Sequence, residues 1–242
     1  MISFLKNVLS ILNLPIIYTI LALDTFIIGG STIILSFIDR TGNGGHYLGK
    51  LWSRMNLLIS LVRTKVRGLQ NIKPGQPYII MSNHRSHYDV WALYGFIPLQ
   101  FRWVMKIELR KIPILGLSCE RIGHIYIDRG KTEKARKILE AAGERIRAGT
   151  SVVFFPEGTR SPDGKLLPFK KGGFMIALEA RVPILPITIN GTSQILPKGS
   201  LRPRPGTIEI NIHPPIHVDG FSVETRDELI EKVREVIESK LE

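Results

Sequence analysis

The sequence predicts an α/β fold: a mixed, largely parallel sheet flanked by helices, preceded by a membrane-associated hairpin of two helices. After residue 62, short apolar runs alternate with amphipathic segments of helical spacing, which is typical of a sheet covered on its faces by helices. Before it, the stretch from Asn7 to Ile38 contains a single charged residue, Asp24. We therefore expect a membrane-anchoring helical segment with a connecting helix in residues 1–62 and an α/β domain in residues 63–242.

The N-terminal stretch is divided by Asp24 into Asn7–Leu23 and Thr25–Ile38. Neither half reaches the about 20 apolar residues that a straight spanning helix needs. We favour a hairpin that dips into one leaflet and bends near Asp24 or Gly29-Gly30. A single span from Leu14 to Ile38, a cleavable signal peptide and a buried hairpin of a soluble protein are the alternatives.

Basic residues follow this stretch closely and predict that the rest of the chain lies on the cytoplasmic side. They are Arg40, Lys50, Arg54, Arg63, Lys65 and Arg67.

In the remainder, a glycine-rich loop at residues 41–45 precedes a segment of helical spacing from Leu51 to Val62, and further helices are expected over Lys131–Ala148 and Val223–Leu241. Six apolar runs have the length and composition of strands. They are Tyr78–Ser82, Phe101–Met105, His124–Ile127, Ser151–Phe155, Ile184–Ile189 and Thr207–Ile212.

The charge composition points to anionic partners. The chain has 33 Lys and Arg against 21 Asp and Glu, a net charge of +12, which suits nucleic acid, a membrane surface or phosphorylated small molecules. The single cysteine, Cys119, excludes a disulfide scaffold and a cysteine-based zinc site.

A candidate catalytic pair follows the first of the six predicted strands. His84 comes directly after that strand and Asp89 follows five residues later. A carboxylate that fixes the imidazole tautomer and stabilises the imidazolium lets a histidine act as a general base. Two other interpretations remain: Ser86-x-x-Asp89 also fits a helix capping box, and His84, His87 and Asp89 could form part of a metal cluster.

A second candidate site follows the strand at residues 151–155. Gly158 lets backbone N–H groups approach an anion, Thr159 offers a hydroxyl, and Arg160 offers a fork that suits phosphate, with Glu157 in support. The alternative for this segment is an ordinary surface loop.

A third candidate, Gly123–Arg129, delivers Asp128 and Arg129 at the end of a strand. Lys106 and the Lys170-Lys171 pair belong to the same series of strand ends and loops and add positive charge to it. Each of these basic residues, taken alone, is equally consistent with a solvated surface charge.

Four blocks of sequence between Val66 and Pro186 together resemble the glycerolipid acyltransferases, in particular the lysophosphatidate acyltransferases. In order, they are the His-x₄-Asp block at residues 83–89, Lys106-Ile107-Glu108-Leu109 through Gly123 to Ile127-Asp128-Arg129, Phe155-Pro156-Glu157-Gly158-Thr159-Arg160-Ser161 with Phe169-Lys170-Lys171-Gly172, and Val182-Pro183-Ile184-Leu185-Pro186.

The resemblance implies that His84, oriented by Asp89, deprotonates the sn-2 hydroxyl of lysophosphatidic acid for direct attack on acyl-CoA or acyl carrier protein, giving phosphatidic acid. It further implies that Arg129, Arg160 and Lys106 hold the acceptor phosphate, with Glu157, Gly158 and Thr159 in support. These six residues, together with His84 and Asp89, make up the predicted site.

The same resemblance implies no metal and no cofactor beyond the acyl donor. The expected partners are membrane lipids, lysophosphatidic acid and the donor, without nucleic acid, and the expected location is the cytoplasmic face of the inner or plasma membrane. An apolar channel for an acyl chain is expected near Val90, Trp91, Ile112 and Leu115.

Three alternative functions stay open at this point. The acceptor could be another glycerol or lysophospholipid, the chain could be a membrane-anchored polyanion-binding protein, or it could be a metal-dependent hydrolase using His84, His87 and Asp89.

Overall fold

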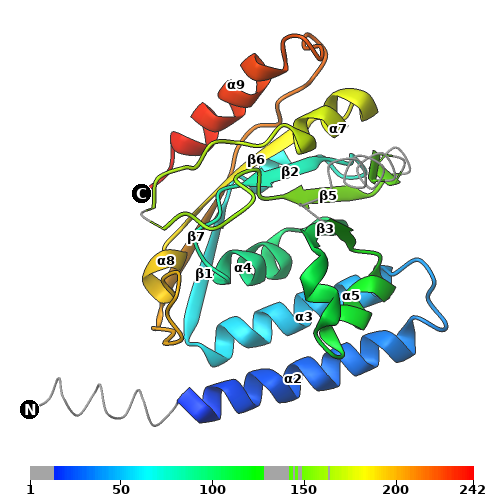
Figure 1. Ribbon diagram of the computed structural model, residues 1–242, viewed down its shortest axis with the longest axis vertical. Helices are drawn as coiled ribbons and strands as arrows, with labels where there is room; N and C mark the ends of the chain where they lie inside the picture. The colour runs from blue at the N-terminus through cyan, green and yellow to red at the C-terminus, as the bar shows by residue number, and fades with distance from the viewer. Residues whose placement is uncertain (1–13, 128–141, 144, 147–148, 163) are drawn as a thin grey trace, which may run out of the picture.

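The computed structural model describes residues 14–127, 142–143, 145–146, 149–162 and 164–242 (Figure 1). The elements in chain order are α2 (Leu14–Leu35), α3 (Asn43–Ile59), β1 (Val62–Arg67), η1 (Leu69–Asn71), β2 (Ile79–Ser82), α4 (Tyr88–Phe96), β3 (Phe101–Lys106), η2 (Ile107–Lys111), α5 (Leu115–Ile122), β4 (Ile125–Ile127), β5 (Ser151–Phe154), α7 (Gly172–Ala180), β6 (Ile184–Asn190), α8 (Thr192–Ile195), β7 (Gly206–Ile212) and α9 (Arg226–Glu238).

The six predicted strands are all present, as β2 to β7, and the predicted C-terminal helix is α9. The sequence pattern missed β1, a strand in which Arg63, Lys65 and Arg67 alternate with the other residues. The helix predicted over Lys131–Ala148 falls largely outside the described residues.

The described strands form one sheet in the order β1-β7-β6-β2-β5-β3-β4. Every neighbouring pair is parallel except β6 and β7, so the predicted mixed, largely parallel sheet is confirmed. Because β6, β2, β5, β3 and β4 run in the same direction, the loops that follow them meet at one edge of the sheet. Ligands of α/β proteins bind at that edge.

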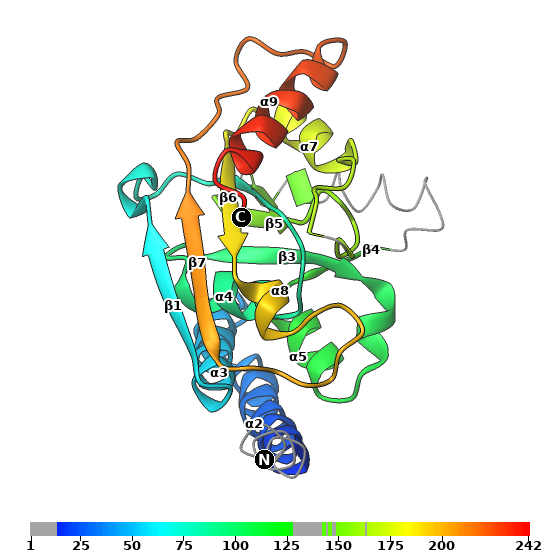
Figure 2. The same ribbon diagram turned by 90° about the vertical axis from the view of Figure 1, so that its left-hand side faces the viewer.

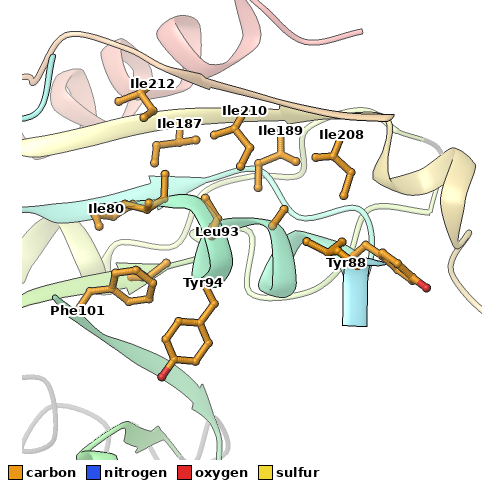
Figure 3. Packing of buried hydrophobic residues seen from close by; sticks show 14 of the residues in the cluster. Ile80, Tyr88, Leu93, Tyr94, Phe101, Ile187, Ile189, Ile208, Ile210 and Ile212 are labelled. Carbon is orange, nitrogen blue, oxygen red and sulfur yellow. The ribbon is translucent and has the colours of Figure 1, made fainter. Parts of the chain in front are cut away.

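Helices cover both faces of the sheet, and each face has its own apolar core. On one face, α3 and α4 pack against isoleucines of β2, β6 and β7 (Figure 3). On the other face, α7 and α9 pack against β2, β5 and β6 (Figure 2). Strand side chains alternate between faces, so a buried run such as β6, with all seven residues buried, supplies both cores at once.

The N-terminal hairpin differs from the prediction in where it bends. Helix α2 runs without interruption through Asp24 and Gly29-Gly30, and the chain turns instead at residues 36–42, so that α3 is the second helix of the hairpin. Gly29 serves a helix contact rather than a bend, because a Cβ there would lie 2.6 Å from Ile114 Cγ2.

Helix α2 is the one helix in the described part of the chain that is long and apolar enough to cross a membrane, by length and composition. Its large apolar side chains are mostly exposed, Phe26 and Ile34 among them. So many exposed large apolar side chains on one helix are unusual at the surface of a soluble protein, which supports contact of α2 with lipid.

We predict that truncating the α9 anchor Leu229, which is fully buried, destabilises the fold. Leu229→Ala should lower the free energy of unfolding by about 2–5 kcal/mol, because it removes buried methyl groups and leaves a cavity. Denaturant unfolding measures the change. The exposed neighbour Glu231, changed to Ala, is the control and should alter the free energy by less than about 0.5 kcal/mol. Equal effects of the two changes would contradict the packing described for α9.

Candidate active site

Three segments that carry predicted site residues end at the same edge of the sheet. His84 follows β2, residues 157–160 follow β5, and Lys106 is the last residue of β3. Since β2, β5 and β3 are parallel neighbours, the topology brings these segments, far apart in sequence, to one edge. His84, residues 157–160 and Lys106 therefore lie at strand ends on one edge of the sheet, as the sequence predicts.

The predicted pair is formed: His84 Nδ1 lies 2.8 Å from Asp89 Oδ2. Asp89 is fully buried, and the His84 side chain keeps 16% of its surface exposed. The same Asp89 oxygen accepts hydrogen bonds from the backbone N–H groups of Arg85, at 2.7 Å, and Ser86, at 2.8 Å. An oxygen with three such neighbours is an acceptor, so Nδ1 carries the ring proton and Nε2 is left with the lone pair that a base needs.

The same bonds bear on the interpretation of Asp89 as part of a helix cap. The backbone bonds from Arg85 and Ser86 to Asp89 close the turn that leads into α4. Asp89 thus orders the start of the helix and orients His84 at the same time, so the two roles are compatible.

Side-chain bonds to β6 and to the segment after it fix the loop that carries His84. The Asn83 amide donates to Ile189 O and accepts from Ile189 N, both at 2.8 Å. Ser86 Oγ donates to Leu196 O at 2.8 Å. The sequence analysis assigned no role to Asn83, whose position beside His84 was the only signal available.

The His84 ring is also held from one face. It stacks on Phe155, with ring centroids 4.0 Å apart and planes 11° apart, and Phe155 in turn stacks on Trp103 at 5.6 Å. Two restraints, the carboxylate at Nδ1 and the stacked ring, therefore define both the position and the plane of the imidazole. This preorganisation suits a group that must meet a substrate proton at a fixed place.

Glu157 lies beneath the site and joins two loops. Its Oε1 accepts from His84 N at 2.7 Å and its Oε2 accepts from Leu167 N at 2.8 Å. The residue is 3% exposed, and burial raises the pKa of its carboxyl group, while the two backbone bonds oppose the increase. Because both of its carboxylate oxygens accept backbone hydrogen bonds, Glu157 stabilises the conformation of the two loops at the site.

The neighbouring Gly158 has a φ of 71°, in the left-handed region, and a Cβ there would lie 2.9 Å from Lys170 Cε. Glycine is thus required both by the turn and by the close approach of Lys170.

The predicted phosphate-binding cations differ in whether they line a pocket. Arg160 lines a pocket together with His87, and its charge and that of His84 lower the pKa of His87, after the larger effect of burial. Thr159 and Lys106 are exposed, and neither is among the residues that line this pocket. Arg129 lies outside the described residues. Lys198, which the sequence analysis did not assign, donates from Nζ to the backbone oxygen of Arg160 at 2.8 Å.

The pocket has a volume of about 780 Å³ and lies between the N-terminal hairpin and the sheet domain. Its walls are mainly apolar and come from α2, α3, α4, β3, η2, α5 and the segment at residues 196–203. The four residues predicted to line an apolar channel, Val90, Trp91, Ile112 and Leu115, all line it. His87 and Arg160 are polar members of its lining.

Two further observations concern metal-ligating and thiol side chains. Across the described ranges, no three His, Cys, Asp or Glu side chains are grouped so that they could hold a metal ion. Cys119 also lines the pocket, but burial raises the pKa of its thiol to about 12, which leaves it a poor nucleophile near neutral pH.

A family model described as Acyltransferase matches residues 63–190, and the chain belongs to that family. Among curated proteins it is 34% identical, over 84% of this chain and 80% of the relative, to a 1-acyl-sn-glycerol-3-phosphate acyltransferase of Pseudomonas aeruginosa. It is 32% identical, over 88% of this chain, to a chloroplastic 1-acyl-sn-glycerol-3-phosphate acyltransferase of Brassica napus, of which it spans 63%.

Among solved structures, the 1-acyl-sn-glycerophosphate acyltransferase PlsC of Thermotoga maritima superimposes with a TM-score of 0.84 at 30% sequence identity. The match covers 98% of this chain and 96% of that one, so the fold similarity includes the N-terminal hairpin.

We predict that Glu157→Gln destabilises the protein by about 1–3 kcal/mol, because the amide NH₂ would face a backbone N–H and leave a buried donor unpaired. Denaturant unfolding is the measurement, and the exposed Glu179, changed to Gln, is the matched control. A stability equal to that of the control would mean that the bonds from His84 and Leu167 do not require a carboxylate.

Proposed function

We propose that the protein transfers a fatty acyl group from a thioester donor to the sn-2 hydroxyl of 1-acyl-sn-glycerol-3-phosphate, giving phosphatidic acid. The observation that carries the proposal is the oriented His84–Asp89 pair, 2.8 Å between Nδ1 and Oδ2, in the same loop and helix start as His87 and Tyr88, which line the large apolar pocket together with Arg160. The names of the relatives of Pseudomonas aeruginosa and Thermotoga maritima support the same acceptor.

In this mechanism His84 is the general base. Its Nε2 takes the proton of the sn-2 hydroxyl as that oxygen attacks the carbonyl carbon of the thioester. Asp89 accepts the Nδ1 proton in a hydrogen bond and stabilises the imidazolium that forms. The tetrahedral intermediate then collapses, the carbon–sulfur bond breaks, and the imidazolium returns its proton to the departing thiolate.

The acyl group passes directly from donor to acceptor. A covalent acyl-enzyme would need a nucleophilic side chain, and the thiol in the pocket, Cys119, is held protonated by burial. A His–Asp pair with one ring nitrogen left to accept a proton suits activation of the acceptor itself.

Acceptor binding is assigned to Arg160, with Lys106 and Arg129 as further cations and Thr159 as a hydroxyl donor. Arg160 is half-buried at the pocket, where a guanidinium forms stronger bonds to phosphate than it does in open solvent. Glu157 and Gly158 support this loop from within.

The pocket and the hairpin together suit a membrane-bound substrate. Acyl chains need an apolar channel, and α2 supplies pocket residues on one side, Tyr18, Leu21 and Ala22, while most of its other apolar side chains are exposed. We place the protein on the cytoplasmic face of the inner or plasma membrane, with the pocket open toward the lipid. The donor is acyl-CoA or acyl carrier protein.

We predict that His84→Ala lowers the rate of acyl transfer by about 10²–10⁴-fold, the usual contribution of a positioned base. The measurement is thiol release from acyl-CoA and from acyl carrier protein by detergent-purified protein, with and without lysophosphatidic acid, in EDTA. The exposed His217, changed to Ala, is the control and should retain full activity.

The possible outcomes separate the alternatives. Acceptor-dependent release in EDTA that only His84→Ala removes supports the proposal. Release without acceptor would indicate a thioesterase, loss of wild-type activity in EDTA would indicate a metal-dependent enzyme, and a His84→Ala protein with altered thermal unfolding would indicate a structural histidine.

We further predict that Arg160→Ala raises the KM for lysophosphatidic acid more than it lowers kcat. The loss of a charge-assisted hydrogen bond to phosphate corresponds to about 1.5–3 kcal/mol. Arg63 on β1, which is exposed and distant in the sheet order from the site, is the control when changed to Ala. An unchanged KM with a reduced kcat would assign Arg160 to the chemical step instead.

A further inference from the structure

Four arginines surround a second hollow, at the turn of the N-terminal hairpin. The cavity has a volume of about 400 Å³, and its lining includes Arg40, Arg102, Arg121 and Arg145. We call it the arginine hollow. Its residues Arg102 and Thr150 lie near the start of β3 and just before β5, whereas His84 follows the opposite, C-terminal end of the neighbouring strand β2. The hollow is therefore separate from the candidate active site.

Arg102 forms the fixed base of the arginine hollow. It is 4% exposed, and its two Nη groups donate only to neutral acceptors among the described residues: Gln100 Oε1, the backbone oxygens of Phe101 and Thr41, and Asn43 Oδ1. Neutral acceptors hold the guanidinium in place without cancelling its charge. Burying a cation in this way is costly unless an anion is close by.

The nearby carboxylates are already engaged. Glu120, which also lines the hollow, is bonded through both oxygens to the Arg110 guanidinium, at 2.7 and 3.0 Å. Asp39 accepts from Thr41 and from the backbone N–H of Gly44, and so caps the start of α3; burial lowers the pKa of Arg102, and the charge of Asp39 partly opposes this effect. The described residues around the hollow therefore carry more positive charge than negative.

The lowered pKa of the buried His124 is consistent with the same positive potential. Burial has the largest effect in lowering its pKa, and the charge of Arg102 comes next, followed by smaller effects that include Arg145. A field that opposes protonation of a neighbour favours an anion in the hollow.

Exposed apolar side chains adjoin the arginine hollow. Phe37 and Ile38, in the hairpin turn, are 68% and 85% exposed. The Arg121 guanidinium carbon lies 5.3 Å from the centre of the Phe37 ring, and Arg40 and Arg121 also line a recess beside Phe37. Cations directly next to exposed apolar side chains match the boundary of a bilayer, where phosphates lie above the hydrocarbon.

We propose that the arginine hollow binds the phosphate of an anionic phospholipid headgroup, while Phe37 and Ile38 enter the hydrocarbon beside it. Guanidinium groups bind phosphate through paired N–H donors, and the prearranged Arg102 removes part of the ordering cost. The bound lipid would fix the depth of the hairpin turn in the membrane. This inference does not depend on the reaction catalysed at His84.

The test is thermal unfolding of the full chain in micelles of a nonionic detergent that contain increasing fractions of phosphatidylglycerol or phosphatidylcholine. A ligand that binds only the folded state raises the Tm by an amount that increases with the ratio of its concentration to its Kd. We expect phosphatidylglycerol to raise the Tm at fractions at which phosphatidylcholine does not. The double variant Arg40→Gln/Arg121→Gln should need about tenfold more phosphatidylglycerol for the same shift, since it loses two solvent-exposed ionic contacts, which are individually weak.

Two controls make the result specific. Arg63→Gln/Arg67→Gln removes the same charge from exposed positions on β1, and Arg160→Ala removes the cation of the active-site pocket. Both should respond to phosphatidylglycerol as the wild type does. An equal loss in the β1 variant would overturn the proposal in favour of general charge attraction, and a loss only in Arg160→Ala would place the lipid in the other pocket.

Inorganic phosphate distinguishes a lipid from a free anion. Millimolar phosphate in lipid-free micelles should leave the Tm unchanged, and a shift as large as that with phosphatidylglycerol would reassign the hollow to soluble phosphates. A double variant that unfolds normally without lipid and still responds fully to phosphatidylglycerol would reject the arginine hollow as the site.

Discussion

The arrangement of the active site depends on one carboxylate oxygen. Asp89 Oδ2 accepts from His84 Nδ1 and from the backbone N–H groups of Arg85 and Ser86, so a single buried atom begins α4, closes the loop after β2 and selects the histidine tautomer. Ordering the start of a helix and orienting a histidine ring are usually separate tasks. Their union means that the His84 ring is as well ordered as the helix start, and that the candidate site cannot relax without disturbing a core helix.

Most of the fold could be predicted from the sequence because its strands are short apolar runs. Strand β1 could not, since its charged residues, Arg63, Lys65 and Arg67, alternate along an edge strand that pairs only with β7 among the described strands. The hairpin bend was placed too early because Asp24 and the two glycines suggested a break. The helix continues there because Gly29 lies against Ile114, a tertiary contact that no local pattern reveals.

The candidate site was predicted in part. The His84–Asp89 pair follows from spacing, because a strand end and a first helical turn bring positions five apart together. The stacking of His84 on Phe155, the hydrogen bonds of Asn83 to Ile189 and the bond from His84 N to Glu157 join residues more than 70 positions apart. Such contacts depend on strand order, which composition and periodicity do not determine. The sequence therefore suggested that Glu157 supports phosphate binding, whereas in the structure it is buried and bonded to the backbone of two loops.

The long-range bonds of the His84 loop also fix when the site can form during synthesis. The loop needs Glu157, Ile189 and Leu196, and these residues leave the ribosome long after His84 does. The apolar helix α2, by contrast, is complete within the first 35 residues. Domains acquire structure as they emerge. The apolar helix is therefore complete in the nascent chain well before His84 is held in place, so under the proposed function the protein could engage a bilayer before its candidate site is assembled.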